Sequence, residues 1–346
     1  MLSQAYMKWF PIPLPPPNSF KDQAILVTGG TSGLGLAAAI HFVNLGATEV
    51  IITSRNASRA KAALETIEKE TGGLSKDCVR VLDLDMNSYA SVVAFAQKIK
   101  KVRAGKGGID YAVLNAGVAG IKFTLSEDGW EQNIQTNALS TALLGHLLLQ
   151  WMKTERPNRS SPAHLAATGS SQHLTADTRD WAEWAAESGI LRHLNRPENW
   201  PGPNPMYAIT KLLAQYAVNE LAQMALGPDG RPEVIVNTMC PGVVKTDFPR
   251  HLVEKSLGYR VAVALFFGGF GKTPENGART YVATGLTKES EHGKFIRFYG
   301  SEAEYRKKAD ILLVGEAGRK MQAQVWSEMK ADFMAKIPDA EEVLAL

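Results

Sequence analysis

Short apolar runs alternate with helical patterns along most of the chain, and this alternation restricts the possible folds more than any other feature. The runs that read as strands lie at 24–30, 49–55, 79–85, 109–117, 164–170, 234–240 and 295–300. The first four are continuously apolar, as in strands that are buried on both faces of a parallel sheet. We therefore predict an α/β fold, a doubly wound parallel sheet of seven strands with helices on both faces.

The domain organisation follows from where this alternation begins and where it is interrupted. With 346 residues, 45% of them hydrophobic, the chain can bury a large core, and we assign residues 23–346 to one catalytic domain. Residues 1–22 form a proline-rich N-terminal arm, polyproline-like at 11–17. Excursions at 171–206 and 247–273 interrupt the alternation, and neither is long enough to be an independent domain.

Charge, cysteine content and hydropathy argue against several classes of protein. The net charge of +3 is spread along the chain, so we expect no nucleic-acid partner. Cys78 and Cys240 have neither disulfide-framework nor metal-ligand spacing. We find no secretory signal and no apolar run of the ~20 residues that span a bilayer. We expect a cytoplasmic protein, with peripheral membrane association through the apolar run 261–270 as the alternative.

The first strand ends in "TGGTSGLG", residues 28–35, and a helical pattern follows. Gly29, Gly33 and Gly35 let the backbone turn tightly and let a pyrophosphate approach the free amides of the helix. Thr31, Ser32 and Leu34 complete the turn. This arrangement predicts a dinucleotide site in a Rossmann-type fold, the alternative being a tight turn without a ligand.

The second and third strands predict which dinucleotide is bound. The second strand ends with Ser54 and Arg55 and has no carboxylate there, which favours the 2′-phosphate of NADP(H) over NAD(H). After the third strand, Asp83 is a candidate to accept a hydrogen bond from the adenine amino group, beside the amide of Leu84. Asp85 is the competing carboxylate.

Tyr207 stands four positions before Lys211 in a helical pattern, so the two side chains share one face of the helix. A neighbouring ammonium stabilises a phenolate, and we expect it to lower the pKa of Tyr207 toward the range useful for acid–base catalysis.

Taken together, these motifs resemble the short-chain dehydrogenase/reductase family from about Gln23 to Gly300. The matching segments, in order, are "TGGTSGLG", "NAG" at 115–117, "IQTNAL" around Asn137, a serine after the fifth strand, "YAITK" and "CPGVVKT" at 240–246. Retinol-dehydrogenase-like members and reductases of fungal natural-product pathways are the most similar in character.

The resemblance implies a role for each matching position. Tyr207 is the proton donor, Lys211 also binds the nicotinamide ribose, and Ser170, or alternatively Ser171, orients the substrate oxygen. Asn137 holds a water that links Lys211 to solvent. The expected cofactor contacts are Asn115, Ala116, Gly117, Pro241, Gly242, Val243, Val244 and Thr246. Tyr216 and Tyr281 are expected to be structural, and a homodimer or homotetramer is implied.

The sequence thus predicts an NADP(H)-dependent oxidoreductase that interconverts a ketone or aldehyde with an alcohol on an apolar small molecule, without a metal. An NADP(H)-binding sensor or scaffold and an epimerase or dehydratase are the alternatives. The aromatic residues of the two excursions would line the substrate pocket, or else pack the excursions onto the body. They are Trp181, Trp184, Trp200, Phe248, Phe266, Phe267 and Phe270.

Overall fold

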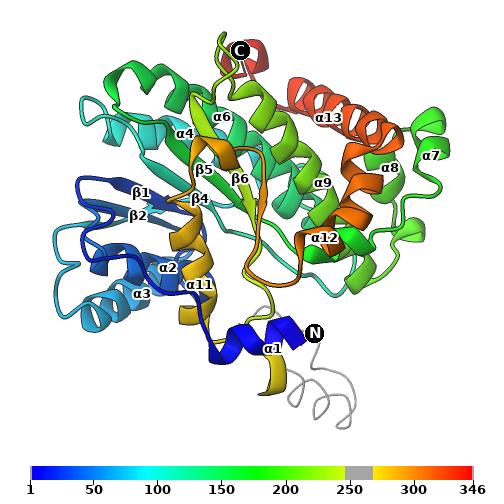
Figure 1. Cartoon of the computed structure of the whole chain (residues 1–346). Helices are drawn as coiled ribbons and strands as arrows, with labels where there is room; N and C mark the ends of the chain where they lie inside the picture. Colours follow the sequence, from blue (N-terminus) through cyan, green and yellow to red (C-terminus); the bar gives the residue numbers. More distant parts are fainter. Residues whose placement is uncertain (1, 246–267, 345–346) are drawn as a thin grey trace.

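The computed structural model describes residues 2–245 and 268–344, and it contains one seven-stranded sheet (Figure 1). All strand pairs are parallel, in the order β3-β2-β1-β4-β5-β6-β7. The strands are β1 (Ala24–Val27), β2 (Glu49–Ser54), β3 (Val79–Asp83), β4 (Tyr111–Leu114), β5 (Ala163–Thr168), β6 (Val234–Met239) and β7 (Phe295–Ile296). The predicted fold class and all seven strands are confirmed.

Several strands end before the apolar pattern does. The first run, predicted to 30, leaves the sheet after Val27, since Gly29 takes φ +64°, a value that belongs to a turn. The carboxyl ends of parallel strands meet at one edge of the sheet, and these early ends leave short loops there.

Helices cover both faces of the sheet. The α-helices are α1 (Leu2–Trp9), α2 (Gly33–Asn44), α3 (Ala57–Glu70), α4 (Tyr89–Val102), α5 (Gln132–Ile134), α6 (Ser140–Thr154), α7 (Trp181–Glu187), α8 (Ile190–Leu194), α9 (Pro203–Met224), α11 (Pro274–Thr284), α12 (Glu302–Ala309), α13 (Glu316–Lys336) and α14 (Ala340–Val343). Short 3-10 turns are η2 (Arg156–Asn158), η3 (Ser171–Thr175), η4 (Pro197–Asn199) and η6 (Glu289–Glu291), and π-helical turns are η1 (Gln135–Leu139) and η7 (Asp310–Val314).

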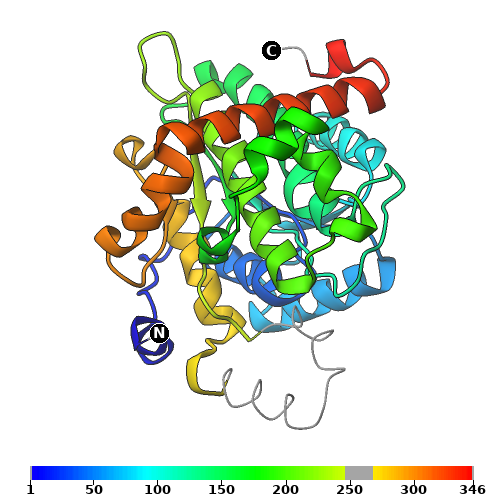
Figure 2. The ribbon, with the colours of Figure 1, turned by 90° about the vertical axis from the view of Figure 1, so that its right-hand side faces the viewer.

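Alternate strand residues face two hydrophobic clusters, one on each side of the sheet. Ile25 and Val27 join the cluster formed with α2, α3 and α11, whereas Leu26 joins the cluster formed with α4, α6 and α9. The long helix α13 lies across α9 on the second side (Figure 2). This packing holds α2 and α9, which carry the glycine turn and Tyr207, against opposite faces of one rigid sheet.

The N-terminal arm contains one helix that the sequence pattern did not predict, α1, followed by a proline-rich segment without regular secondary structure at 11–16. Phe20, within the range assigned to the arm, is fully buried and lies 5.0 Å from Phe42, ring centroid to ring centroid. The last residues of the arm therefore belong to the core on the α2 side. By contrast, Tyr6, Trp9 and Phe10 at the start of the arm are exposed.

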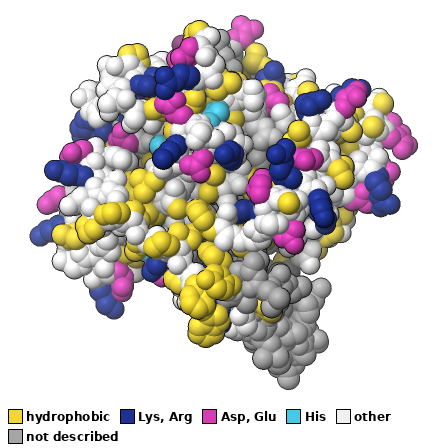
Figure 3. Space-filling view, in the orientation of Figure 1, with side chains coloured by type: hydrophobic (Ala, Val, Ile, Leu, Met, Phe, Trp, Pro, Cys, Tyr) yellow, Lys and Arg dark blue, Asp and Glu magenta, His cyan; other side chains and the backbone are white. Residues whose placement is uncertain are grey.

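The surface of the protein carries charges of both signs. On the face shown in Figure 3, acidic and basic side chains are interspersed.

The excursion at 171–206 folds into η3, α7, α8 and η4. Trp181 is fully buried and packs edge-on against Tyr216 of α9, with ring centroids 6.5 Å apart. Trp184 stacks on His193 at 3.9 Å. Trp181 therefore fastens the excursion to α9, whereas the Trp184–His193 stack lies within the excursion itself. Most of the second excursion lies outside the described residues.

Candidate active site

A cavity of about 360 Å³ opens at the carboxyl edge of the sheet and brings together residues from most of the chain. Seventeen of the predicted site residues line it: Gly29, Thr31, Ser32, Gly33, Leu34, Ser54, Arg55, Leu84, Asn115, Ala116, Gly117, Ser170, Tyr207, Lys211, Pro241, Gly242 and Val244. We call the part lined by Ser54, Arg55 and Asp85 the β2–β3 end, and the part lined by Ser170, Tyr207 and Lys211 the β5–β6 end.

The glycine turn has the backbone that a phosphate cradle requires. Gly29 and Gly33 both have positive φ, 64° and 54°, which side-chain-bearing residues rarely adopt. Ser32 precedes α2 without capping it, so the first amides of the helix are left for an anion at its positive end. Gly35 does not line the cavity. A Cβ there would come within 2.5 Å of the Gly29 carbonyl oxygen, so Gly35 allows α2 to pack against the turn.

At the β2–β3 end, Arg55 and Asp85 form an ion pair with 3.5 Å between Nη1 and Oδ1. Arg59 of α3 lines the same end and was not identified from the sequence. Asp83 does not line the cavity: its side chain is 92% exposed and lies 3.9 Å from Lys98. The structure therefore favours the competing Asp85 as the carboxylate facing a ligand here.

At the β5–β6 end, Lys211 and Tyr207 lie on one face of α9, as predicted. Lys211 Nζ lies 5.7 Å from the centroid of the Tyr207 ring and donates a hydrogen bond of 2.7 Å to the carbonyl oxygen of Thr168. Tyr207 is hydrogen-bonded to the side chain of Ser170. Ser170, Tyr207 and Lys211 therefore lie close together at the carboxyl end of β5.

The expected lowering of the Tyr207 pKa is not seen. Burial raises the pKa of Tyr207 above its ordinary value, and the hydrogen bond with Ser170 only partly opposes this. The same burial lowers the pKa of Lys211 to about 8. The sequence argument considered the charge of the lysine but not the desolvation of the pair. Tyr207 is consequently a protonated phenol at neutral pH, suited to donate a proton.

Of the two candidate serines, Ser170 lines the cavity and bonds Tyr207, while Ser171 faces elsewhere. Ser171 Oγ lies 2.7 Å from the hydroxyl of Tyr299, which is also 2.7 Å from Cys240 Sγ. His173 reinforces the same turn, with Nδ1 2.7 Å from the carbonyl oxygen of Ser170. The geometry thus favours Ser170 as the serine that faces a substrate.

Asn137 lies in the π-helical turn η1 and does not line the large cavity. Its Oδ1 accepts a hydrogen bond from the Val118 amide at 2.8 Å, and its Nδ2 donates to the Val118 carbonyl at 2.9 Å and to Thr210 Oγ1 at 3.2 Å. Asn137 therefore clamps the loop after β4 to α9. Gly117 permits this contact, because a Cβ there would lie 3.1 Å from Asn137 Oδ1.

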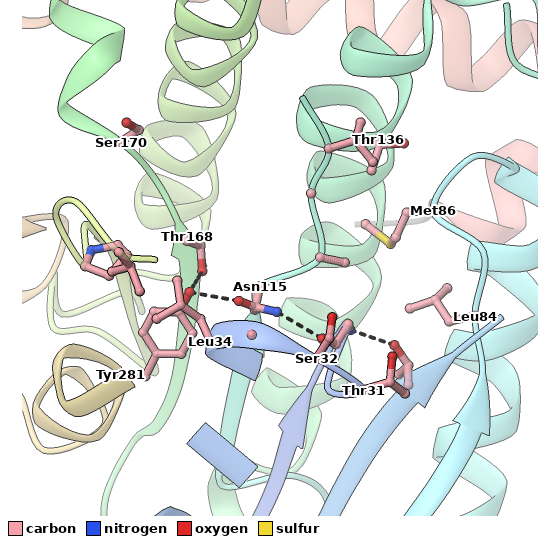
Figure 4. Close-up of a pocket in the computed structure, with 18 of the residues that line it drawn as sticks. Thr31, Ser32, Leu34, Leu84, Met86, Asn115, Thr136, Thr168, Ser170 and Tyr281 are labelled. Carbon is pink, nitrogen blue, oxygen red and sulfur yellow. Dashed lines mark hydrogen bonds between the residues drawn. The ribbon is translucent and has the colours of Figure 1, made fainter. Parts of the chain in front are cut away.

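Tyr281 was expected to be structural, but it lines the cavity (Figure 4). Its hydroxyl donates to Asn115 Oδ1 at 2.8 Å and accepts from Thr168 Oγ1 at 3.0 Å, which joins the ends of β4 and β5. Asn115 Nδ2 in turn donates to the Thr28 carbonyl at 2.8 Å. No local spacing marks Tyr281, since its partners lie over a hundred residues earlier in the sequence. Tyr216 is structural, as expected: its hydroxyl donates to the Leu312 carbonyl at 2.9 Å.

Some predicted residues remain away from the cavity or outside the described residues. Val243 does not line the cavity, and Thr246, Phe248, Phe266 and Phe267 lie outside the described residues. The predicted aromatic lining is wrong for the described members. Trp181, Trp184, Trp200 and Phe270 do not line the cavity, since the three tryptophans pack on the body instead. Within the described part of the chain, we find no cluster of metal ligands and no helix long and apolar enough to cross a membrane.

Comparison with known proteins agrees with this geometry. The family model for short chain dehydrogenases matches residues 23–170. The short-chain dehydrogenase/reductase phmF of Phaeosphaeria nodorum is 33% identical over 332 residues, which is 95% of this chain and 91% of that protein. The short-chain dehydrogenase/reductase ffsI of Aspergillus flavipes is 33% identical over 336 residues, or 96% of this chain and 92% of that protein.

Solved structures share the fold at lower identity. Levodione reductase has a TM-score of 0.60 and 18% identity, and the alignment covers 82% of this chain and 99% of that one. A short chain dehydrogenase from Escherichia coli CFT073, complexed with NADPH, has a TM-score of 0.56 and 20% identity, with 81% and 98% covered.

Proposed function

The chain belongs to the short-chain dehydrogenase/reductase family, and within that family of oxidoreductases we propose that it uses NADP(H) to interconvert a ketone or aldehyde with an alcohol on an apolar small molecule. The observation that carries the proposal is the convergence of Ser170, Tyr207 and Lys211 with the glycine turn in one cavity. A sensor or scaffold would have no need of these three side chains together.

The residues present fit a dinucleotide laid along the carboxyl edge of the sheet. The glycine turn and the free amides of α2 suit a pyrophosphate. Arg55 and Arg59, with Ser54 at the end of β2, suit a 2′-phosphate and support NADP(H) over NAD(H). At the other end, Lys211 is the group that would hold the nicotinamide ribose. The bound nicotinamide supplies or accepts the hydride.

The chemistry left to the protein is binding, orientation and movement of one proton. Ser170 would orient a carbonyl oxygen beside Tyr207, and the protonated phenol would donate to that oxygen as the alcohol forms. Lys211 would stabilise the resulting phenolate. Among the described residues that line the β5–β6 end, Lys211 is the charged one and Val118, Pro241 and Val244 are apolar. This lining supports an uncharged, apolar substrate.

The proposal is tested by following the transfer of deuterium from labelled NADPH to the product. The protein is incubated with NADPH carrying deuterium at the transferable position of the nicotinamide, together with a panel of apolar ketones. We expect deuterium in the alcohol product. NADPH binding without any labelled product would favour the sensor, and substrate conversion without net NADPH consumption would favour an epimerase or dehydratase.

A further inference from the structure

The turn that carries Ser170 is packed against the neighbouring strands. Ser170 follows β5 at the edge of the cavity (Figure 4). At Gly169, just before it, an added Cβ would come within 2.4 Å of Thr238 Cγ2 on β6 and 3.1 Å of Phe295 Cε2 on β7. Ser170 Oγ accepts a hydrogen bond of 3.3 Å from the Gln172 amide, where η3 begins. The position of the serine hydroxyl therefore depends on how firmly this turn is held.

His173 is the first of two side chains that hold the turn. Its Nδ1 lies 2.7 Å from the carbonyl oxygen of Ser170, and because a carbonyl can only accept, Nδ1 carries a proton. The backbone amide of His173 donates to the same oxygen at 3.0 Å. The side chain is fully buried, and burial lowers its pKa to about 4, so the imidazole is neutral at pH 7. One residue thus supplies two donors to the Ser170 carbonyl.

Two aromatic rings fix the plane of the His173 imidazole. Phe295 of β7 and Tyr305 of α12 are stacked with centroids 5.0 Å apart, and the imidazole meets them edge-on at 5.0 and 5.9 Å. Among the described residues, none bonds His173 Nε2, which is buried. A buried ring nitrogen without a partner is unfavourable, and an apolar side chain would pack here without that loss. Packing alone therefore does not explain a histidine at this position, whereas the bond from Nδ1 does.

Tyr299, in the segment after β7, is the second side chain that holds the turn. Its hydroxyl lies 2.7 Å from Ser171 Oγ and 2.7 Å from Cys240 Sγ, so it links the turn after β5 to the loop after β6. Arg297 in turn fixes Tyr299. Its Nη1 donates to the Tyr299 carbonyl, and its guanidinium carbon lies 5.9 Å from the centroid of the tyrosine ring. The segment that begins with β7 therefore supports the serine turn at two points.

We propose that His173 and Tyr299 are positioning residues, which together fix the serine turn so that the Ser170 hydroxyl lies where it can bond a substrate oxygen beside Tyr207. Neither His173 nor Tyr299 lines the cavity, so each acts through the turn and not on the substrate. The consequence for catalysis rests on the function proposed above, whereas the hold on the turn does not.

The first test compares two substitutions of similar size at His173. An asparagine Nδ2 can donate near the place of the imidazole Nδ1, whereas a leucine has no donor. Because small displacements of a positioning group reduce rate strongly, we expect His173→Leu to lower kcat for ketone reduction by about tenfold and His173→Asn to stay within about threefold of the wild type. NADPH affinity, measured by fluorescence, should be the same in both. Both variants lose the ring contacts alike, so equal losses of kcat would overturn the role of the Nδ1 bond.

The second test removes the other support. Tyr299→Phe keeps the ring and should lower kcat by about three- to tenfold, again without a change in NADPH affinity. Since both side chains act on one turn, the double variant His173→Leu/Tyr299→Phe should lose less than the product of the two single losses. Losses that simply multiply would show that the two side chains do not act through the same turn.

His164→Leu is the matched control. His164 also lies on β5 and its Nε2 is 2.9 Å from the carbonyl oxygen of Thr287, but it stands at the opposite end of the strand from Ser170. This substitution should leave kcat unchanged. A loss as large as that of His173→Leu would show that any buried histidine on this strand has the same effect, and the proposal would fail.

The hold on the turn is also measured without turnover, by NMR of the protein labelled with nitrogen-15 in histidine. The signals missing from His173→Asn assign His173, and we expect the wild type to carry the ring proton on Nδ1 at pH 7. A proton on Nε2 instead would overturn the proposal. If the wild type reduced no ketone, the proposed function would fail, and the position of this proton would still decide whether His173 donates to the turn.

Discussion

At the β2–β3 end of the cavity, Arg55 and Asp85 lie 3.5 Å apart with side chains 56% and 40% exposed, whereas at the β5–β6 end Lys211 is only 7% exposed. An exposed pair is surrounded by solvent, which screens its charges and leaves its contribution small. A buried ammonium feels the loss of solvent instead, and burial lowers the pKa of Lys211 to about 8. The charges at the β2–β3 end are therefore screened by solvent, whereas at the β5–β6 end burial changes the protonation of a charged group.

The substitution expected to separate the two ends most clearly is the removal of the half-buried phenol of Tyr207. Tyr207→Phe keeps the ring and its packing but deletes the proposed proton donor. Because positioned acids contribute about 10²–10⁴-fold to rate, we expect kcat to fall by roughly a thousandfold. NADPH affinity, measured by fluorescence, should stay within about threefold, since the phosphate contacts lie elsewhere. A variant that retained wild-type turnover would remove Tyr207 from the mechanism.

The exposed end is tested by reversing a charge. Arg55→Asp replaces a guanidinium beside the proposed 2′-phosphate with a carboxylate. After allowance for solvent screening we expect NADPH affinity to fall by roughly 10–100-fold, about 1.4–2.8 kcal/mol, while NADH affinity changes by less than about threefold. Arg179→Asp is a suitable control, because Arg179 is an exposed arginine that pairs with Asp177 away from the cavity lining. Equal losses of affinity for NADPH and NADH would show that Arg55 does not bind the 2′-phosphate.

The buried end makes a prediction about pH. Lys211 loses its proton as the pH rises through about 8, so its charge, and with it NADPH affinity, should decline by roughly tenfold between about pH 7 and pH 9. Lys211→Met should bind more weakly and show no such decline. A pH-independent affinity in the wild type would contradict the contribution of the ammonium.

The same substitution should have the opposite effect on stability. The folded pKa of Lys211 lies below the ordinary 10.5, so the fold disfavours the charged form; this penalty is fully present below about pH 8 and is relieved as the pH rises toward 10.5. Lys211→Met should therefore raise the free energy of unfolding at neutral pH, by about 1–3 kcal/mol in denaturant titrations. Destabilisation by Lys211→Met would mean that the ammonium is well solvated by the protein.

Local sequence patterns were sufficient to predict much of the fold and part of the candidate site. The seven strands, the glycine turn and the Tyr207–Lys211 pair depend on residues that are close in sequence, and each was predicted. The place of Tyr281 in the cavity, and the choice between a pocket role and a packing role for Trp181, could not be predicted because their surroundings come from distant segments. Tyr281 joins Asn115 and Thr168, and Trp181 packs on Tyr216. The pKa of Tyr207 was misjudged for the same reason, since the burial that raises it is a property of the assembled fold.

The smallest expected effect distinguishes two carboxylates that the sequence could not rank. Asp85 lines the β2–β3 end beside Arg55, while Asp83 points to solvent near Lys98. Asp85→Asn removes a negative charge close to the proposed 2′-phosphate and frees the guanidinium, so we expect NADPH affinity to rise by about two- to fivefold at low salt and the gain to shrink as salt is added. Asp83→Asn, the matched control, makes the same chemical change two residues earlier, at a side chain that does not line the cavity, and should alter affinity by less than about twofold. If Asp83→Asn instead weakened both NADPH and NADH while Asp85→Asn did nothing, the adenine would be bound by Asp83, and the carboxylate would have to turn inward when the cofactor binds.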